Sequence, residues 1–271
     1  MSYGSHVELS GKNILITGAA SGIGRALAIR FAEEGPASLT LLDLHQPPVQ
    51  DLAQELASDT LDVLAMGVDV ADESQIEAAV AEAESHFGPM DLCCSNAGIG
   101  TGGGAEVPTE DWQRIWDINL MAHVHMARAV LPSMLGRGDG YLLNTASAAG
   151  LLTQIGSAPY AVTKAAAVSF AEWLAITHGH QGLKVSVLCP QAVNTPMIAG
   201  MDQGGVAGVD GVIEPEELAE VVVAGIAEER FLILPHPKVE EYVRRKGDDY
   251  ERWITGMQRL QQRFPTQEFG E

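Results

Sequence analysis

Short apolar runs alternate with segments of helical periodicity along the whole chain, and this alternation restricts the fold more than any other feature of the sequence. The runs cover residues 13–17, 38–42, 63–68, 91–95, 140–145, 184–189 and 231–234. Helical patterns cover residues 23–34, 75–86, 111–134, 160–178 and 215–228. Such short runs of consecutive apolar residues are typical of strands buried on both faces. The order predicts an α/β fold: a doubly wound, Rossmann-like, mainly parallel seven-stranded sheet with helices on both faces.

No repeat and no linker-like stretch divides the 271 residues, so we expect one domain over residues 1–271 with its core at about 9–235. Residues 237–271 are charged and are expected to form a helical extension at the surface, with the basic residues 244–246 on a solvated face. Whether this extension covers a neighbouring subunit's cleft or packs on the sheet edge stays open.

The chain contains 36 acidic and 16 basic residues, which gives a formal charge of −20. This charge argues against nucleic-acid and membrane-surface partners, because both are anionic. The cysteines, Cys93, Cys94 and Cys189, lie in or at the end of apolar runs without a metal-ligand spacing, so we expect no metal site and reduced thiols. No stretch has the composition of a membrane span, and we expect a cytoplasmic protein.

A glycine-rich turn follows the first apolar run. Gly18, Gly22 and Gly24, with Ser21 and Ile23 between them, open the first helical segment. Glycines here allow a sharp turn and a close approach of backbone to a pyrophosphate, and the helix terminus offers free N–H groups. The turn therefore predicts a dinucleotide site, although a glycine loop without a ligand would have a similar sequence.

Asp43 ends the second apolar run, where a carboxylate can accept hydrogen bonds from the adenosine ribose hydroxyls and repel a 2′-phosphate. No Lys or Arg occupies residues 19–21 or 44–46 to receive such a phosphate, and His45 is mostly neutral near pH 7. We therefore predict NAD rather than NADP, against the alternative that Asp43 is a solvated strand-end residue.

Four polar residues form a candidate catalytic group. Tyr160 and Lys164 are four residues apart in a helical segment and share a face. Ser147 follows the fifth run, at the edge where open α/β sheets bind ligands, and Asn119 lies in the preceding helical segment. Each of these residues has an ordinary structural explanation by itself. Their combination in a chain that also contains a dinucleotide turn predicts a catalytic site.

The chain resembles the short-chain dehydrogenase/reductase family over about residues 9–235. The matching motifs are TGAASGIG at 17–24, VDV at 68–70, the triplet at 96–98, Asn119, Ser147, the Tyr160/Lys164 pair and the segment 190–195. The resemblance implies that Tyr160 is the general acid/base, with its phenol pKa lowered by Lys164 and the positive nicotinamide. It further implies that Lys164 holds the ribose hydroxyls, that Ser147 positions the substrate oxygen, and that Asn119 supports a water path to Lys164.

The same resemblance implies the remaining cofactor contacts. Asp69 and Val70 would meet the adenine, residues 96–98 would lie beside the ribose, and Val193 and Thr195 would fix the carboxamide. The complete expected cofactor set is Gly18, Ser21, Gly22, Ile23, Gly24, Asp43, Leu44, Asp69, Val70, Asn96, Ala97, Gly98, Tyr160, Lys164, Pro190, Val193 and Thr195.

The expected substrate contacts are Ser147, Tyr160, Gln154, Met197 and Gln191, the last of which replaces the glycine usual in the family. Residues 196–213 have the composition of a mobile, apolar lid whose charged residues are both acidic, so the segment should clamp no anion. We therefore expect a hydrophobic secondary alcohol or ketone that is cyclic, aromatic or steroid-like.

Two alternatives remain. A 3-oxoacyl-carrier-protein reductase needs a basic docking surface and usually NADP, which the net charge and Asp43 disfavour. A non-catalytic dinucleotide-binding scaffold would tend to lose Ser147, Tyr160 or Lys164, all of which are present. Segments 111–134 and 160–178 are apolar on several faces, more than a monomer surface would be. The resemblance implies that these two helices form a subunit interface, so we expect a homotetramer or homodimer, with His123 and His125 at the surface or interface.

Overall fold

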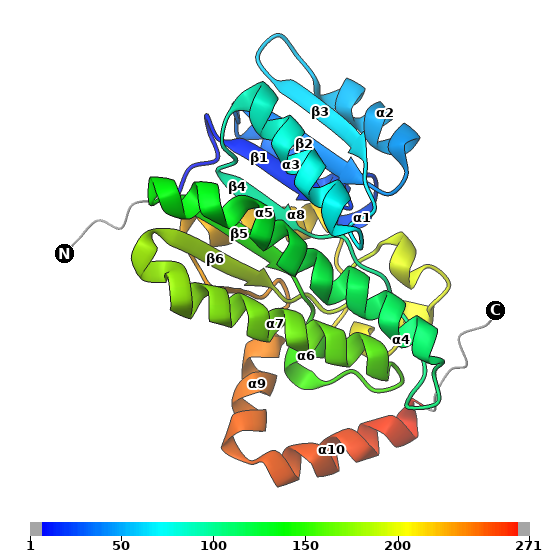
Figure 1. The fold of residues 1–271 in the computed structure, drawn as a ribbon. Helices are drawn as coiled ribbons and strands as arrows, with labels where there is room; N and C mark the ends of the chain where they lie inside the picture. The colour runs from blue at the N-terminus through cyan, green and yellow to red at the C-terminus, as the bar shows by residue number, and fades with distance from the viewer. Residues whose placement is uncertain (1–6, 265–271) are drawn as a thin grey trace.

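Seven strands form one sheet in the computed structural model, which describes residues 7–264 (Figure 1). The strand order is β3-β2-β1-β4-β5-β6-β7, and every neighbouring pair is parallel. The strands are β1 (Asn13–Thr17), β2 (Ser38–Asp43), β3 (Asp62–Gly67), β4 (Leu92–Ser95), β5 (Gly140–Thr145), β6 (Leu183–Leu188) and β7 (Leu232–Ile233). The predicted doubly wound sheet is confirmed, and no predicted strand end is wrong by more than one residue.

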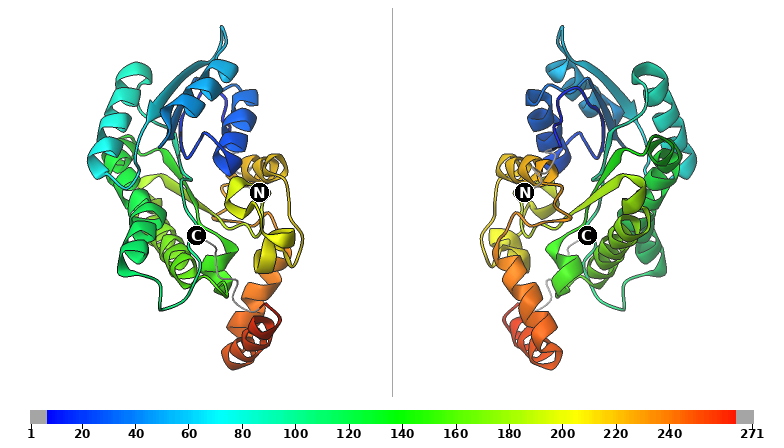
Figure 2. Two further views of the ribbon diagram at one scale, coloured as in Figure 1. Left: turned by 90° about the vertical axis from the view of Figure 1, so that its right-hand side faces the viewer. Right: turned by 90° about the vertical axis from the view of Figure 1, so that its left-hand side faces the viewer.

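Helices cover both faces of the sheet (Figure 2). The α-helices are α1 (Gly22–Glu33), α2 (Gln46–Leu56), α3 (Glu73–Phe87), α4 (Thr109–Trp116), α5 (Ala122–Arg137), α6 (Ala148–Leu152), α7 (Ala158–His178), α8 (Pro215–Ala227), α9 (Lys238–Asp248) and α10 (Tyr250–Arg263). Side chains alternate along each strand, so Ile14 and Ile16 pack with α1, α2 and α8, whereas Leu15 packs with α3, α5 and α7. Short 3-10 turns are η2 (Gly179–Gln181), η3 (Pro196–Ile198) and η4 (Asp202–Gly208).

Two helices and one interruption differ from the sequence prediction. Helix α2 begins with prolines in its first turn, where their missing N–H groups are not needed, and it was not predicted. The short α6 was also not predicted. The single helix expected over 111–134 is instead α4, a π-helical turn η1 (Asp117–Met121) and α5. Such π-turns often mark functional sites, and this one contains Asn119.

The prediction that His123 and His125 lie at the surface or interface is wrong. Both side chains are buried within the subunit, and His123 is only 2% exposed. Burial lowers the pKa of His123 to about 3, with the Lys164 charge acting in the same direction, so its ring is neutral. His125 Nδ1 lies 3.3 Å from the Val70 carbonyl and connects α5 to the segment after β3.

The C-terminal extension forms two helices rather than the one expected. The break is at Asp249, whose extended backbone ends α9 and whose side chain caps α10 by accepting the Arg252 N–H at 2.9 Å. The basic residues of α9 are not all solvated as predicted, because Lys246 Nζ donates to the Leu151 carbonyl at 2.6 Å. Helix α10 lies below α6 and is joined to the sheet region through α9 (Figure 1).

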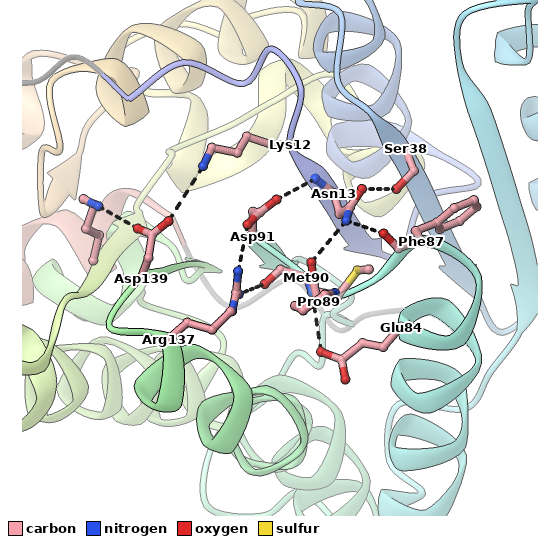
Figure 3. A network of polar contacts seen from close by, with 11 residues as sticks. Lys12, Asn13, Ser38, Glu84, Phe87, Pro89, Met90, Asp91, Arg137 and Asp139 are labelled. Carbon is pink, nitrogen blue, oxygen red and sulfur yellow. Dashed lines mark hydrogen bonds and ion pairs between the residues drawn. The ribbon is translucent and has the colours of Figure 1, made fainter.

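A polar network joins the elements at the amino ends of the strands, opposite the edge where the site residues gather (Figure 3). Asp91 accepts the Asn13 backbone N–H at 2.9 Å and pairs with Arg137 at 3.0 Å. Arg137 also donates to the Met90 carbonyl at 2.7 Å. The network therefore ties the starts of β1 and β4 to the end of α5. No helix within residues 7–264 is long and apolar enough to cross a membrane.

The glycine turn supports a first prediction. A Cβ on Gly24 would lie 2.1 Å from the Gly18 carbonyl oxygen, which is backbone and has no room to move. We expect Gly24→Ala to lower the free energy of unfolding by about 2 kcal/mol and to weaken dinucleotide binding. Gly136→Ala is the matched control, because that helical position is open and the change should be neutral or stabilising. Equal denaturation midpoints for the two variants would contradict the prediction.

Candidate active site

The glycine turn packs tightly against the end of β4. Gly18 has φ +65°, and a Cβ there would lie 2.9 Å from the Ala97 Cα. A Cβ on Gly24 would also lie 2.7 Å from the Asn96 side-chain nitrogen. The turn then leads into α1, whose N-cap Ser21 makes no side-chain capping bond and whose first turn has no acidic residue. The N–H groups at the start of α1 therefore remain available to an anionic ligand, which fits a pyrophosphate.

Thr17 joins the predicted residues of β1 and β4, although it was not itself predicted as a site residue. Its hydroxyl oxygen accepts the backbone N–H groups of Asn96 at 2.9 Å and Ala97 at 3.0 Å. Asn96 in turn donates its side-chain amide to the Thr17 carbonyl at 3.1 Å. A buried polar residue that ends an apolar strand was the signal for this role in the sequence.

Asp43 lies at the end of β2, facing the glycine turn. Its carboxylate accepts the Ala20 N–H at 3.0 Å and the His45 N–H at 3.1 Å, one with each oxygen. Each carboxylate oxygen can accept a further hydrogen bond, which leaves capacity for ribose hydroxyls. Leu44 beside it is 61% exposed, as expected of a residue that lies over the mouth of a ligand site.

The segment after β3 continues this side of the site. The Val68 N–H donates to the Asp43 carbonyl at 2.8 Å and so places Asp69 and Val70 next to the end of β2. Asp69 accepts the Ala71 N–H at 3.0 Å, and Val70 is buried. The two residues predicted to meet adenine are therefore adjacent to the residue predicted to hold its ribose.

Lys164 and Asn119 converge on Gly98. A Cβ on Gly98 would lie 3.3 Å from Lys164 Nζ and 3.2 Å from Asn119 Oδ1, so a larger residue there would press on both side chains. The Asn119 side chain pairs with the backbone of Ile99, accepting its N–H and donating to its carbonyl, both at 2.9 Å. This pairing fixes the segment after β4 against the π-turn, and the water path to Lys164 stays a prediction.

The Lys164 ammonium is only 2% exposed and donates to the Thr145 carbonyl at 2.9 Å. It makes no ion pair with any carboxylate of residues 7–264. Burial lowers the pKa of Lys164 to about 8 because the charged form loses its hydration. Thr145 was not predicted as a site residue, since a backbone carbonyl leaves no signal in the side-chain pattern.

Tyr160 lies one helical turn before Lys164, whose Nζ is 5.7 Å from the centre of the tyrosine ring. The sequence analysis expected a lowered phenol pKa, but in the protein alone the direction is opposite. Burial raises the pKa of Tyr160 because phenolate is poorly solvated there, and the neighbouring Ser147 hydroxyl acts in the lowering direction. The lowering expected with a positively charged nicotinamide beside the ring stays a prediction.

Ser147 caps α6 at the end of β5. Its Oγ accepts the Ala149 N–H at 3.1 Å and donates to the Pro190 carbonyl at 3.3 Å. These contacts hold the hydroxyl at the wall of a cavity of about 1040 Å³. Gln154 and Gln191 also line this cavity, whereas Tyr160 and Met197 do not, and Met197 is 44% exposed.

The segment after β6 reaches back to the glycine turn. A Cβ on Gly22 would lie 3.1 Å from the Thr195 methyl group, so these two predicted cofactor residues are neighbours. Val193 is buried and bridges to Ile213. The Gln191 amide, predicted to donate to substrate, instead donates to Asp210 at 3.0 Å, and its amide oxygen is buried without a partner.

Most predicted cofactor residues thus lie in the segments that follow the parallel strands, at the carboxyl edge of the sheet and on both sides of the point between β1 and β4 where the strand order reverses. Their chemistry fits a dinucleotide: an uncapped helix terminus for phosphates, a carboxylate for a ribose, and a buried ammonium for a second ribose. Within residues 7–264 no cluster of His, Cys, Asp or Glu is arranged to hold a metal.

Comparison with known proteins agrees with this geometry. Residues 12–204 match the family model described as short chain dehydrogenase. The chain is 34% identical over 253 residues to 1-deoxy-11-beta-hydroxypentalenate dehydrogenase of Streptomyces exfoliatus, covering 92% of each chain. It is 31% identical over 223 residues to meso-2,3-butanediol dehydrogenase of Serratia marcescens, covering 80% of this chain and 87% of that one.

Among solved structures, a short-chain dehydrogenase/reductase from Burkholderia phymatum in complex with NAD superimposes with a TM-score of 0.82. The sequence identity is 31%, with coverage of 90% of this chain and 96% of that one. These matches, together with the candidate site at the carboxyl edge of the sheet, define an oxidoreductase of the nicotinamide-dependent class. The chain belongs to the short-chain dehydrogenase/reductase family, and the expected family membership is confirmed.

The buried ammonium supports a prediction on pH and stability. Because the pKa of Lys164 is about 8 when folded and near 10.5 when unfolded, the unfolded state binds more protons between these values. The stability of the wild type relative to Lys164→Met should therefore rise by about 2 kcal/mol from pH 7.5 to pH 9.5. Urea denaturation of both proteins across this range measures the difference, and a flat or falling difference would contradict the prediction.

Proposed function

We propose that this protein is an NAD-dependent oxidoreductase that transfers a hydride between nicotinamide and a hydrophobic secondary alcohol or ketone. The observation that carries the proposal is the buried ammonium of Lys164. It lies one helical turn from Tyr160 and close to Gly98, next to the predicted cofactor residues. An unpaired buried charge is unfavourable for stability, so its retention indicates a use.

When bound, the nicotinamide accepts or returns the hydride, and the residues of this chain handle the proton. The Tyr160 oxygen takes the hydroxyl proton during oxidation and returns it during reduction. Lys164 favours the phenolate electrostatically and donates to ribose hydroxyls. The Ser147 hydroxyl orients the substrate oxygen, and Asn119 holds the segment after β4 in place through Ile99.

NAD is favoured over NADP by the charge at the end of β2. The Asp43 carboxylate is held toward the glycine turn by the Ala20 N–H, where a 2′-phosphate would meet a like charge. The similar Burkholderia phymatum protein was solved with NAD. The buried, free cysteines suit a reducing cytoplasm.

The substrate class follows from the cavity at Ser147. Its wall includes Leu152, Ile155, Val206 and Val209, and its volume of about 1040 Å³ admits a ring system. The names of the Streptomyces and Serratia relatives each specify a hydroxyl-bearing compound as the molecule dehydrogenated. Both features support a hydrophobic, cyclic secondary alcohol or its ketone as substrate.

We also infer a homodimer or homotetramer formed through α7. This helix leaves Val162, Trp173 and Ile176 exposed, and the Phe170 and Trp173 rings stack with centroids 6.4 Å apart. Such an apolar stripe on a helix marks a contact surface. The corresponding surface of α5 is smaller than the sequence suggested, because Met126 and both histidines face the core.

Tyr160→Phe tests the chemistry. We expect it to lower kcat with a cyclic secondary alcohol about 1000-fold, because the proton has no acceptor, while NAD binding stays unchanged. Steady-state NADH formation and calorimetric titration with NAD measure the two effects. Turnover that survives the substitution would show that Tyr160 is not the acid/base.

Asp43→Asn tests the cofactor assignment, because asparagine keeps an oxygen for the Ala20 N–H but loses the charge. We expect the wild type to prefer NAD, and the variant to lose about tenfold in kcat/KM for NAD while accepting NADP better. A wild type that prefers NADP would overturn the assignment.

A further inference from the structure

Helix α10 forms the far wall of the cavity that begins at Ser147. The near wall consists of Ser147, Ala148 and Ala149 with residues 152–155, and the far wall consists of residues on α10. Figure 1 shows α10 running below α6, held at a distance by α9. The helix buries no side chain fully against the rest of the chain. Its cavity-facing surface is therefore available to whatever the cavity binds.

That surface has a definite pattern. Trp253, Met257, Leu260 and Phe264 line the cavity, are half-buried, and follow one another at helical spacing. Arg252 and Arg263 line the same cavity at the two ends of this stripe, about 16 Å apart along the axis. An apolar stripe with a guanidinium at its end suits a ligand that is apolar along its length and anionic at one end.

The charges of the wall are unusual for this chain. The whole sequence has 16 basic and 36 acidic residues, yet three arginines and two aspartates line the cavity. Arg245 pairs with Glu241, and Asp249 is engaged in capping α10. Asp248 is exposed at the end of α9, where the two helices meet, and it adds a negative charge to this part of the cavity wall.

Arg252 differs from Arg245 because it makes no ion pair with any described residue. It also lies in the first turn of α10, where the helix dipole disfavours a cation. Asp249 and Glu251 already place negative charge at this end of the helix, but neither pairs with the Arg252 guanidinium. A carboxylate in the cavity could therefore form a charge-assisted hydrogen bond with this guanidinium.

We propose that the substrate of this enzyme carries a carboxylate at the end remote from its carbinol, and that Arg252 binds this group while the stripe from Trp253 to Phe264 binds the ring system. The proposal rests on the proposed dehydrogenase function, which places the carbinol at Ser147. The anion is held by α10 and not by residues 196–213, whose charged residues are acidic.

The test is calorimetric binding to the full chain in the presence of saturating NAD. Secondary alcohols on cyclohexane, decalin and steroid ring systems are each offered as the carboxylate and as its methyl ester; lithocholate represents the steroid pair. We expect the wild type to bind at least one carboxylate about tenfold more tightly than its ester. Arg252→Met should remove this preference without changing ester affinity, and Arg252→Lys should retain part of it.

Arg259→Met is the matched control, because Arg259 lies on the same helix outside the cavity lining. Equal binding of every acid and ester, binding of none of the carboxylates, or equal effects of Arg252→Met and Arg259→Met would overturn the proposal. Measuring NADH formation with the same compounds distinguishes a failure of the α10 carboxylate site from a failure of the proposed dehydrogenase function. A carboxylate preference without turnover supports the α10 site and contradicts the dehydrogenase assignment, whereas turnover of neutral alcohols without any preference for a carboxylate over its ester supports the dehydrogenase assignment and contradicts the α10 site.

Discussion

The desolvated ammonium of Lys164 is the constraint around which the site is arranged. It lies at the end of β5 with one fixed partner, the Thr145 carbonyl, and no carboxylate among the described residues neutralises it. Lys164 and Asn119 both approach Gly98 closely, so a Cβ at this position would press on both of their side chains. Asn119 is in turn presented by a π-turn that interrupts what would otherwise be one helix. The backbone irregularity and the buried charge are therefore two parts of one arrangement, in which local stability is given up for an ammonium group at the candidate site.

The parallel sheet separates this function from the contacts that hold the strands together. All strands run in one direction, so the loops that follow them converge on one edge and carry the candidate site. The opposite edge carries the network of Asn13, Asp91 and Arg137, which joins the starts of two central strands to α5 (Figure 3). The polar contacts that join the starts of β1 and β4 are therefore made without using the polar groups at the first edge.

The strands and most of the site were predictable from sequence because both depend on local signals. Apolar runs ended by Thr17, Asp43 or Asn96 mark buried strands whose polar ends meet at one edge. Contacts that depend on backbone atoms were not predictable, such as the Thr145 carbonyl that holds Lys164. The extent to which burial opposes the phenolate of Tyr160 was also not predictable from sequence, and the expected lowering of its pKa beside a bound nicotinamide stays a prediction. The burial of His123 was missed for a related reason: a histidine without a partner is polar by type but can remain neutral in a core.

The replacement of the usual family glycine by Gln191 is explained by the C-terminal extension rather than by the reaction. Asp210 is only 6% exposed, and its carboxylate accepts hydrogen bonds from Gln191, Lys238 and Tyr242. Two of these donors belong to α9, so the segment after β6, the loop that contains Asp210 and the extension share one buried carboxylate. A glycine at 191 would remove one of the three hydrogen-bond donors to the Asp210 carboxylate. It would thereby weaken the attachment of α9 to the segment after β6. Since α9 packs against α10 and leads into it, the identity of residue 191 bears on the far wall of the cavity at Ser147 although its side chain is turned toward Asp210.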